Sequence, residues 1–344
     1  MIKSVKLAGK YLDQPLLVSK FKQAVPTIFT AGAAAYGVGN VIEAEPENRK
    51  KVAIRDASVL SATVVSALAA PRIAAKVVGK TYEKFASKDI IKKNTQIVDE
   101  FVSKEKVSDK LGSLLEKAKT NVLNFKEVKA LHEETSKTEN GKKLFNTLIP
   151  EPENVTSKDI VNEIGRLSVL GAIPVAGGVA GGLAGEKISD GKLSKEHTAN
   201  RVKEGAYQYL ANIFLCNVGA ATALGIMEKT NVKSKAGRVA GMVTGILTTG
   251  VIGGSAIANY IGKKVVNPIF DKNSDKKLNS ERKPEVLDIC LHSDDIATIA
   301  VMSGLKWMEP ALPILYGISG YRAGIGYRNG NKDKKNVDNT LAIA

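Results

Sequence analysis

The chain has 344 residues and a formal net charge of +15, and 44% of its residues are hydrophobic although only 5% are aromatic. Lysine and arginine are spread over nearly every connecting segment, and no aromatic residues alternate with them, which argues against a nucleic-acid-binding protein. Two cysteines are too few for a disulfide framework, and the three histidines lack metal-ligand spacing. The apolar residues instead gather in long uncharged blocks.

The first 80 residues combine a basic segment with two apolar blocks. Residues 1–23 form a basic amphipathic N-terminal segment with five lysines and no continuous apolar stretch of the kind that a signal peptide needs. Uncharged blocks follow at 25–42 and at 57–71, and the second can continue to residue 79. A helix crosses a bilayer with about 20 apolar residues, so we predict transmembrane helices 1 and 2 within 24–80.

Residues 81–157 differ in composition and are predicted to form a soluble, charged helical insertion. Apolar residues between 90 and 125 recur mostly at spacings of three, four or seven, and charges fill the other faces. Two interpretations stay open. The segment is either a solvated helical hairpin that packs on itself, or an element that docks a partner or lies on a lipid surface.

The rest of the chain returns to apolar blocks, which lie at 167–185, 205–227, 239–262 and 296–321. We predict transmembrane helix 3 within 158–192, a second three-helix membrane unit at 205–332 and a flexible tail at 333–344. The predicted fold class is therefore all-α, a polytopic membrane protein with about six transmembrane helices. The alternative is a soluble, alanine-rich helical bundle.

A glycine-rich stretch around Pro174 recurs 139 residues later around Pro313. Six of nineteen aligned positions are identical, and a weaker match at an offset of 183 joins the preceding blocks in the same order. We therefore predict two copies of a three-helix unit, at 24–192 and 205–332. Because each copy has an odd number of spans, six spans would place the second copy upside down, as in many transporters with inverted repeats.

Glycines recur at four-residue spacing inside these blocks. In a membrane helix, a face without side chains lets a second backbone approach closely, so this spacing is typical of helix packing. The alternative is a conduit lined by glycine. The glycines predicted to pack are Gly177, Gly178, Gly181, Gly185, Gly237, Gly241, Gly245, Gly317, Gly320 and Gly324.

Each half also carries an acid and a base three residues apart, shortly before the matching proline. These pairs are Glu163 with Arg166 and Lys306 with Glu309. Charges inside an apolar helix are costly and often mark a substrate site, so the four residues are the candidate polar site. The alternative places them at the membrane interface, with Trp307 in an aromatic belt. Helix breaks, which would free backbone carbonyls, are expected at Pro174, Pro310 and Pro313.

No catalytic signature is present. The sequence contains neither a P-loop nor a dinucleotide-binding fingerprint, so we expect a protein that is not an enzyme and has no metal or cofactor. The leading hypothesis is transport or permeation of an unknown solute. One alternative is a membrane scaffold or assembly protein that acts through glycine-faced packing and the insertion. Another is a soluble protein that enters membranes late.

The expected partners follow from the same features. Basic flanks beside apolar spans suit a bilayer with anionic headgroups, and residues 81–157 could bind a second copy or another protein. No nucleic acid is expected. The lysines of the insertion favour a multi-pass protein whose termini and insertion lie in the cytoplasm.

Overall fold

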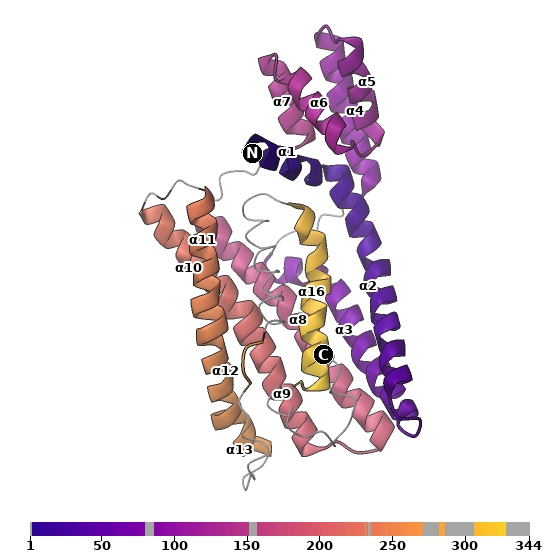
Figure 1. Cartoon of the computed structure of the whole chain (residues 1–344), viewed down its shortest axis with the longest axis vertical. Coiled ribbons are helices and arrows are strands. Elements are labelled where there is room, and N and C mark those ends of the chain that lie inside the picture. The colour runs from indigo at the N-terminus through magenta and orange to yellow at the C-terminus, as the bar shows by residue number, and fades with distance from the viewer. Residues whose placement is uncertain are drawn as a thin grey trace. The chain divides into compact units, whose positions relative to one another are not determined.

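The computed structural model describes a helical chain, and every regular element in the described ranges is a helix. Those ranges are 2–79, 86–150, 157–230, 232, 235–270, 282–285 and 306–327. The chain divides into two compact units. Unit 1 takes in residues 1–25, 83–155 and 300–310, and unit 2 takes in 26–82, 156–299 and 311–344. Figure 1 shows the helices of both.

Unit 1 is a bundle of short amphipathic helices with its own apolar core. It consists of α1 (Ile2–Leu12), the first part of α2 (Pro15–Glu43), α4 (Ser87–Lys104), α5 (Asp109–Thr120), α6 (Phe125–Thr135) and α7 (Glu139–Leu148). Leu115, Val128 and Leu131 are fully buried at its centre, and Leu7 and Tyr11 of α1 pack against the same core. The insertion therefore packs as four helices, not as one hairpin.

Local sequence signals explain where these short helices begin. The Ser108 and Thr138 side chains cap α5 and α7 by accepting a hydrogen bond from a backbone N–H three residues on. Asn124 and Glu127 form a reciprocal capping box at the start of α6. Such caps satisfy backbone donors that the helix itself leaves unpaired.

Unit 2 consists of long apolar helices. They are the second part of α2, α3 (Arg49–Val77), α8 (Ser157–Asp190), α9 (Lys195–Tyr209), α10 (Leu215–Lys229), α11 (Lys235–Gly245), α12 (Ser255–Ile261), α13 (Asn267–Phe270) and α16 (Leu312–Ile325). Three π-helical segments join some of them end to end, namely η1 (Leu210–Phe214), η2 (Ile246–Gly254) and η3 (Gly262–Val266). As a result, α9 to α10 and α11 to α13 each form one continuous helix (Figure 1).

Five helices in the described part of the chain are long and apolar enough to cross a membrane. They are Pro15–Glu43, Arg49–Val77, Ile164–Asp190, Lys195–Lys229 and Ala240–Phe270. The first five predicted blocks lie in these helices, so the fold fits a multi-pass membrane protein. The first span begins at Pro15, well inside the segment predicted to be only a basic extension.

The sixth predicted block differs from the prediction. Residues 296–305 lie outside the described residues, and a short 3₁₀ helix, η5 (Lys306–Ala311), precedes α16. The 14 residues of α16 rise about 21 Å at 1.5 Å each, less than the roughly 30 Å of a bilayer core. Gly326 ends α16 with a φ of +68°, a left-handed conformation that glycine adopts without strain.

Two faces of α8 carry glycines, and the first faces α3. A Cβ atom added at Gly181 would lie 2.7 Å from the Ser58 carbonyl oxygen, and one at Gly185 would lie 3.0 Å from the Arg55 Cα. A Cβ at Gly177 would overlap the hydroxyl of Ser66. Real Cβ contacts are longer, so only glycine allows the two backbones to lie this close.

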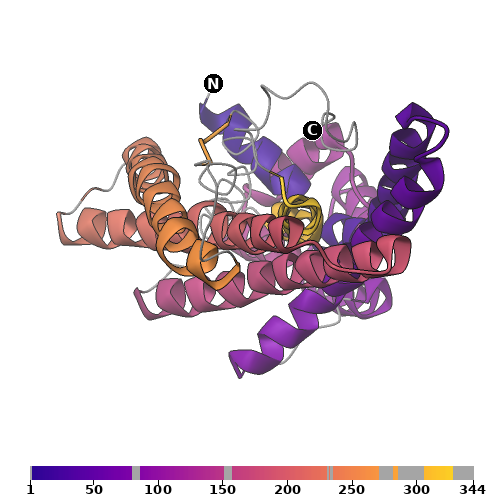
Figure 2. The ribbon, with the colours of Figure 1, turned by 90° about the horizontal axis from the view of Figure 1, so that it is seen from below.

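The second face of α8 contacts α16. A Cβ at Gly178 would overlap the carbonyl oxygen of Gly320, and one at Gly182 would overlap that of Gly324. Seen from below, α16 lies against α8 and α9 (Figure 2). The glycine-rich stretches that match in sequence therefore contact each other, which the sequence comparison did not predict.

The direction of this contact bears on the predicted repeat. Residue numbers on both helices rise together from the Gly178–Gly320 contact to the Gly182–Gly324 contact, so α8 and α16 run parallel. Corresponding helices of an inverted pair run antiparallel. The two helices therefore lack the relation that inverted repeats require, and the repeat itself stays a prediction.

The other glycines named from the sequence also lie in helices. Gly245 contacts Gly219 of α10, Gly241 faces the Met227 side chain, and Gly317 faces the ring of Phe29. Gly237 lies in α11.

The expected helix break at Pro174 is wrong. The helix α8 runs from Ser157 to Asp190 without interruption, and Pro174 lies inside it. Proline removes one backbone hydrogen bond, at a cost of about 3 kcal/mol, and packing against α3 and α16 on both sides offsets that cost. Pro310 and Pro313 do lie where the helix type changes, from η5 to the first turn of α16.

Candidate functional site

A row of buried polar side chains follows one face of the continuous helix from α9 to α10. Its members are Glu204, Gln208, Asn212 and Asn217, each at most 2% exposed. The Gln208 side-chain amide donates to Glu204 Oε1 at 2.8 Å, and the Asn212 amide donates to Gln208 Oε1 at 2.9 Å. We call these four residues the polar row.

The spacing of the polar row follows from the helix geometry. The first three members are four residues apart, which places them on one face of an α-helix. The next member, Asn217, is five residues on, and the π-helical segment Leu210–Phe214 contains Asn212 and ends before Asn217. A π segment adds a residue to a turn, so the shift keeps Asn217 near the same face.

Charged groups surround the first member of the row. Arg282 Nε lies 3.4 Å from Glu204 Oε2, and both side chains are fully buried. The Arg282 guanidinium stacks 4.7 Å above the ring of Tyr207. The Asn259 side chain holds the Arg282 backbone through two hydrogen bonds, of 2.8 and 2.9 Å. A buried charge needs such a set of partners, because an unpaired one would shift its pKa and neutralise.

A second carboxylate, Glu285, extends this network to the end of α16. Arg322 donates to Glu285 at 3.1 Å, and the Tyr327 hydroxyl donates to it at 3.0 Å. The rings and guanidinium groups alternate, because both Arg282 and Arg322 stack on Tyr327. Burial raises the pKa of the Tyr327 hydroxyl, and the Glu285 carboxylate raises it further. The hydroxyl therefore stays protonated and able to donate.

A neighbouring ion pair connects α8, α9 and α16. Glu186 and Arg201 form a buried salt bridge, and Arg201 Nε donates to the Gly324 carbonyl oxygen at 2.8 Å. Glu186 also contacts His197 Nδ1 at 2.8 Å and accepts from the Ser194 backbone N–H at 3.1 Å. Each of the two carboxylate oxygens of Glu186 thus has a partner, which is typical of a structural ion pair.

The four site residues predicted from the sequence lie elsewhere. Glu163 and Arg166 are in α8, where Arg166 is partly buried, and Lys306 and Glu309 are in η5, where Glu309 is partly buried. The side chains of Glu163 and Lys306 lie outside the described residues, so a substrate site at these pairs stays a prediction.

The polar row was missed by sequence reasoning. The predicted uncharged block begins at Gly205, directly after Glu204, so it excludes the one charged member of the row. A usable signal was present, since Glu204, Gln208 and Asn212 are spaced at one helical turn in an apolar surrounding.

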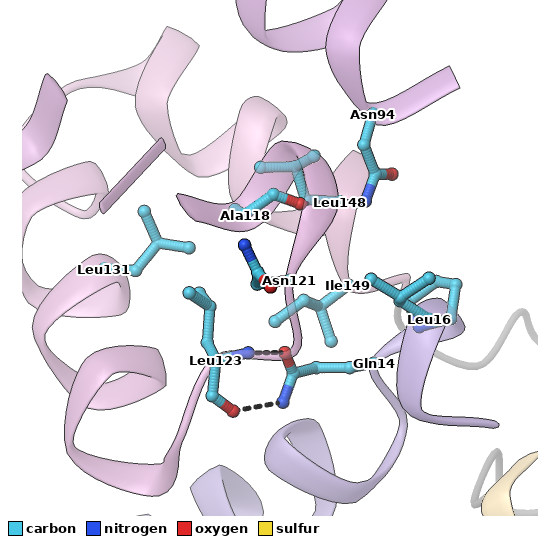
Figure 3. A pocket seen from close by; sticks show the side chains of 10 residues that line it. Gln14, Leu16, Asn94, Ala118, Asn121, Leu123, Leu131, Leu148 and Ile149 are labelled. Atoms are coloured by element: carbon cyan, nitrogen blue, oxygen red, sulfur yellow. Dashed lines mark hydrogen bonds between the residues drawn. The ribbon is translucent and has the colours of Figure 1, made fainter. Parts of the chain in front are cut away.

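Unit 1 contains a small cavity that is too small for a ligand. It encloses about 20 Å³, room for one water molecule. Its wall includes the Gln14 side chain, whose amide forms two 2.8 Å hydrogen bonds with the Leu123 backbone (Figure 3). These hydrogen bonds connect the junction between α1 and α2 to the insertion. The cavity beside them is therefore a packing defect within the core of unit 1.

In comparisons with known proteins, no family model, no curated protein and no solved structure matches the chain. Within the described ranges, no three His, Cys, Asp or Glu side chains lie close enough together to hold a metal ion.

Proposed function

We propose that the protein is a non-enzymatic membrane protein that lets a small polar solute or ion cross the bilayer, and that the polar row lies on its path. The observation that carries the proposal is the row itself. Four polar side chains are buried along one face of a helix that is otherwise apolar enough to cross a membrane. Polar groups in such a position are costly, face the helix bundle and commonly mark a solute or proton pathway.

The dimensions of the polar row fit this role. Thirteen residues separate Glu204 from Asn217, which corresponds to about 20 Å along a helix, or two thirds of a bilayer core. Carboxamides both donate and accept, so Gln208 and Asn212 can exchange their mutual hydrogen bond, and Asn217 its bond to the Ile213 carbonyl oxygen, for bonds to a passing polar group.

Two π-helical segments lie at the polar row. The segment η1 is part of the helix that carries the row and contains Asn212, and η1 packs against η2 of the neighbouring helix. π segments are frequent at functional sites, because their hydrogen bonds are readily rearranged to α-helical ones. A shift of either segment by one residue would change which side chains line the path.

The test is a flux measurement in proteoliposomes that hold the purified protein. The probes are protons, sodium, potassium, chloride and a panel of radiolabelled amino acids. Gln208→Leu removes the centre of the polar row at nearly constant volume and is expected to lower at least one flux by tenfold or more. Thr222→Val, on the exposed face of α10, is the matched control and should not change it. Equal fluxes in Gln208→Leu and wild type would refute the role of the row.

The charged pairs near the prolines are proposed as a separate candidate for the substrate site, independent of the polar row. Glu309→Gln tests this, since loss of the carboxylate should alter a flux that the wild type supports. Unchanged flux for every probe would exclude Glu309 from the substrate site.

Before either flux test, extraction of membranes at high pH and high salt should leave the protein in the pellet. Release into the supernatant would refute the membrane-spanning arrangement.

A second candidate function is a membrane scaffold, and the observation that favours it is the separate core of unit 1. This bundle carries surface ion pairs, such as Lys110 with Glu134 and Lys117 with Glu127, around its own apolar core. Deleting Ser87–Pro152 separates the two functions. Loss of a binding partner with unchanged flux favours the scaffold, whereas unchanged partners with lost flux favour transport.

We also propose that the N-terminus and the insertion face the cytoplasm, where their lysines would meet anionic headgroups. The C-terminus would share that side with six spans, as the sequence predicts, whereas the five candidate spans of the described residues would place it on the opposite side. Cysteines introduced one at a time at Ser103 and Lys187 should be labelled from opposite sides of intact vesicles by a membrane-impermeant maleimide. Labelling of both from one side would contradict this orientation.

A further inference from the structure

A second buried polar cluster lies where α2, α3 and α16 meet, apart from the polar row. Its centre is Asp56 of α3, which is 4% exposed and lies in the candidate span Arg49–Val77. The Asn40 side-chain amide of α2 donates to Asp56 Oδ2 at 2.7 Å and to the Tyr321 hydroxyl of α16 at 3.2 Å. The Tyr36 ring packs edge-on against the Tyr321 ring at 5.4 Å.

No cation accompanies this carboxyl group among the described residues. Arg55, the preceding residue, points to α8, where it donates to Asp190 at 2.5 Å and to Ser189 at 3.2 Å. Arg322, which follows Tyr321, binds Glu285. Each arginine is directed away because neighbouring residues of a helix lie about 100° apart around its axis.

The described parts of the neighbouring helices place no other charged group against Asp56. The α8 face that contacts α3 presents glycines, its Asp190 is paired with Arg55, and α2 contributes Tyr36 and Asn40. On α3 itself, Thr63 lies two turns further along the same face, is buried, and has a hydroxyl without a hydrogen-bond partner. Asp56 is thus surrounded by neutral polar groups in an apolar setting.

We propose that Asp56 is a proton-binding site that is occupied at neutral pH. An aspartate in water loses its proton near pH 3.9. Burial without a cation strongly disfavours the charged form, so the folded protein keeps the proton on Asp56. The inference goes beyond the proposed solute path and does not depend on it.

Loose packing of α2 gives the site a means of releasing its proton. Only 6% of the apolar window of α2 is buried, compared with 33% for α3 and 50% for α8. Near Asp56, α2 touches α3 at Gly37, where a Cβ would lie 2.8 Å from Leu60, and at Asn40. Separation of α2 would admit water to the carboxyl group and restore its ordinary acidity.

Infrared spectroscopy of the purified protein in nanodiscs tests the proposal directly. The wild type is expected to show the carbonyl band of a protonated carboxyl group at pH 7, shifted in heavy water, and Asp56→Asn should lack it. Asp190→Asn is the matched control, because Asp190 is paired with Arg55 and should contribute no such band. Spectra of wild type and Asp56→Asn that coincide at pH 7 would overturn the proposal.

Two further measurements keep the test decisive. If Asp56→Asn does not fold, Asn40→Leu is measured instead. This substitution removes the amide that donates a hydrogen bond to the charged form of Asp56. The pH at which the carbonyl band disappears should therefore rise by about one to two units. An unchanged midpoint would contradict the assignment. Adding sodium ions to the wild type should leave the band in place, and its loss would instead identify Asp56 as a cation ligand.

Discussion

The substitution Gly178→Ala tests whether the contact between α8 and α16 depends on the absence of a side chain. The added methyl group would occupy the position of the Gly320 carbonyl oxygen, which belongs to the backbone and cannot rotate away. The two helices must therefore separate by roughly 1 Å, which forfeits a quarter to a half of the dispersion energy between the atoms in contact.

The expected change in the free energy of unfolding for Gly178→Ala is the sum of two opposing contributions. Overpacking costs about 3 kcal/mol, the upper part of the usual range, because the obstructing atom is backbone. Alanine in place of glycine in a helix contributes about 1 kcal/mol of stability. The net loss for Gly178→Ala is about 2 kcal/mol. The matched control is Gly165→Ala in the same helix, where a Cβ meets nothing within 4 Å, so only the gain of about 1 kcal/mol remains.

Unfolding of both variants in mixed micelles of increasing dodecyl sulfate content, followed by helical circular dichroism, measures the difference. We expect the two free energies of unfolding to differ by about 3 kcal/mol, with opposite signs relative to wild type. Equal effects of the two substitutions would show that α8 and α16 do not touch at Gly178, and the parallel arrangement would then be wrong.

Three further predictions concern charges and caps. Glu204→Leu removes the nearer of two carboxylates beside the buried Arg282, leaving Glu285 at 3.9 Å, and should cost about 3 kcal/mol of stability. Adding Arg282→Met to it should recover most of that loss in the same micelle assay. Asn124→Ala removes the α6 cap and should lower the stability of α6 by about 1 kcal/mol, measured by amide hydrogen exchange with α4 as the internal reference. In unit 1, the Lys117 ammonium and the Asn124 backbone N–H lower the pKa of Glu127, and the ammonium groups of Lys137 and Lys110 lower that of Glu134. A carboxyl group whose pKa is lowered by folding contributes stability that is fully present above its unfolded pKa of about 4.3 and is lost as the pH falls through its folded pKa. The hydrogen-exchange protection of α6, corrected for the intrinsic exchange rate, should therefore be constant between about pH 5 and 7 and should decrease at pH values below about 4.

Helix length and apolar content could be predicted from the sequence because both are properties of a contiguous stretch. Five of the predicted blocks lie in helices long enough to cross a membrane. Of the periodic apolar residues of the insertion, Leu111, Leu115 and Ala118 lie in the core of unit 1, whereas Phe125 is exposed. The residues at which the helices begin and end were harder to predict from the sequence. Pro15 could begin α2 because proline suits a first turn, and Pro174 could remain inside α8 because packing on both sides offsets one lost hydrogen bond.

The polar clusters depend on contacts between distant segments, which a single sequence does not contain. Asn40, Asp56 and Tyr321 come from three helices, and nothing in their sequence spacing places them together. The matching glycine stretches did carry a signal, but sequence identity gives neither the direction of two helices nor the fact that they touch. Both were supplied by the Gly178 and Gly182 contacts.

The glycine face that α8 turns toward α16 also has a consequence for biosynthesis. About 140 residues separate Gly182 from Gly324, and a ribosome adds roughly 5 to 20 residues each second. For about 7 to 28 seconds α8 therefore exists before α16 is synthesised, and lipid chains or another helix must cover the exposed backbone. During that interval a second nascent chain offering the same glycines is a competitor for the contact, so the rate of elongation between residues 190 and 312 becomes a determinant of correct assembly.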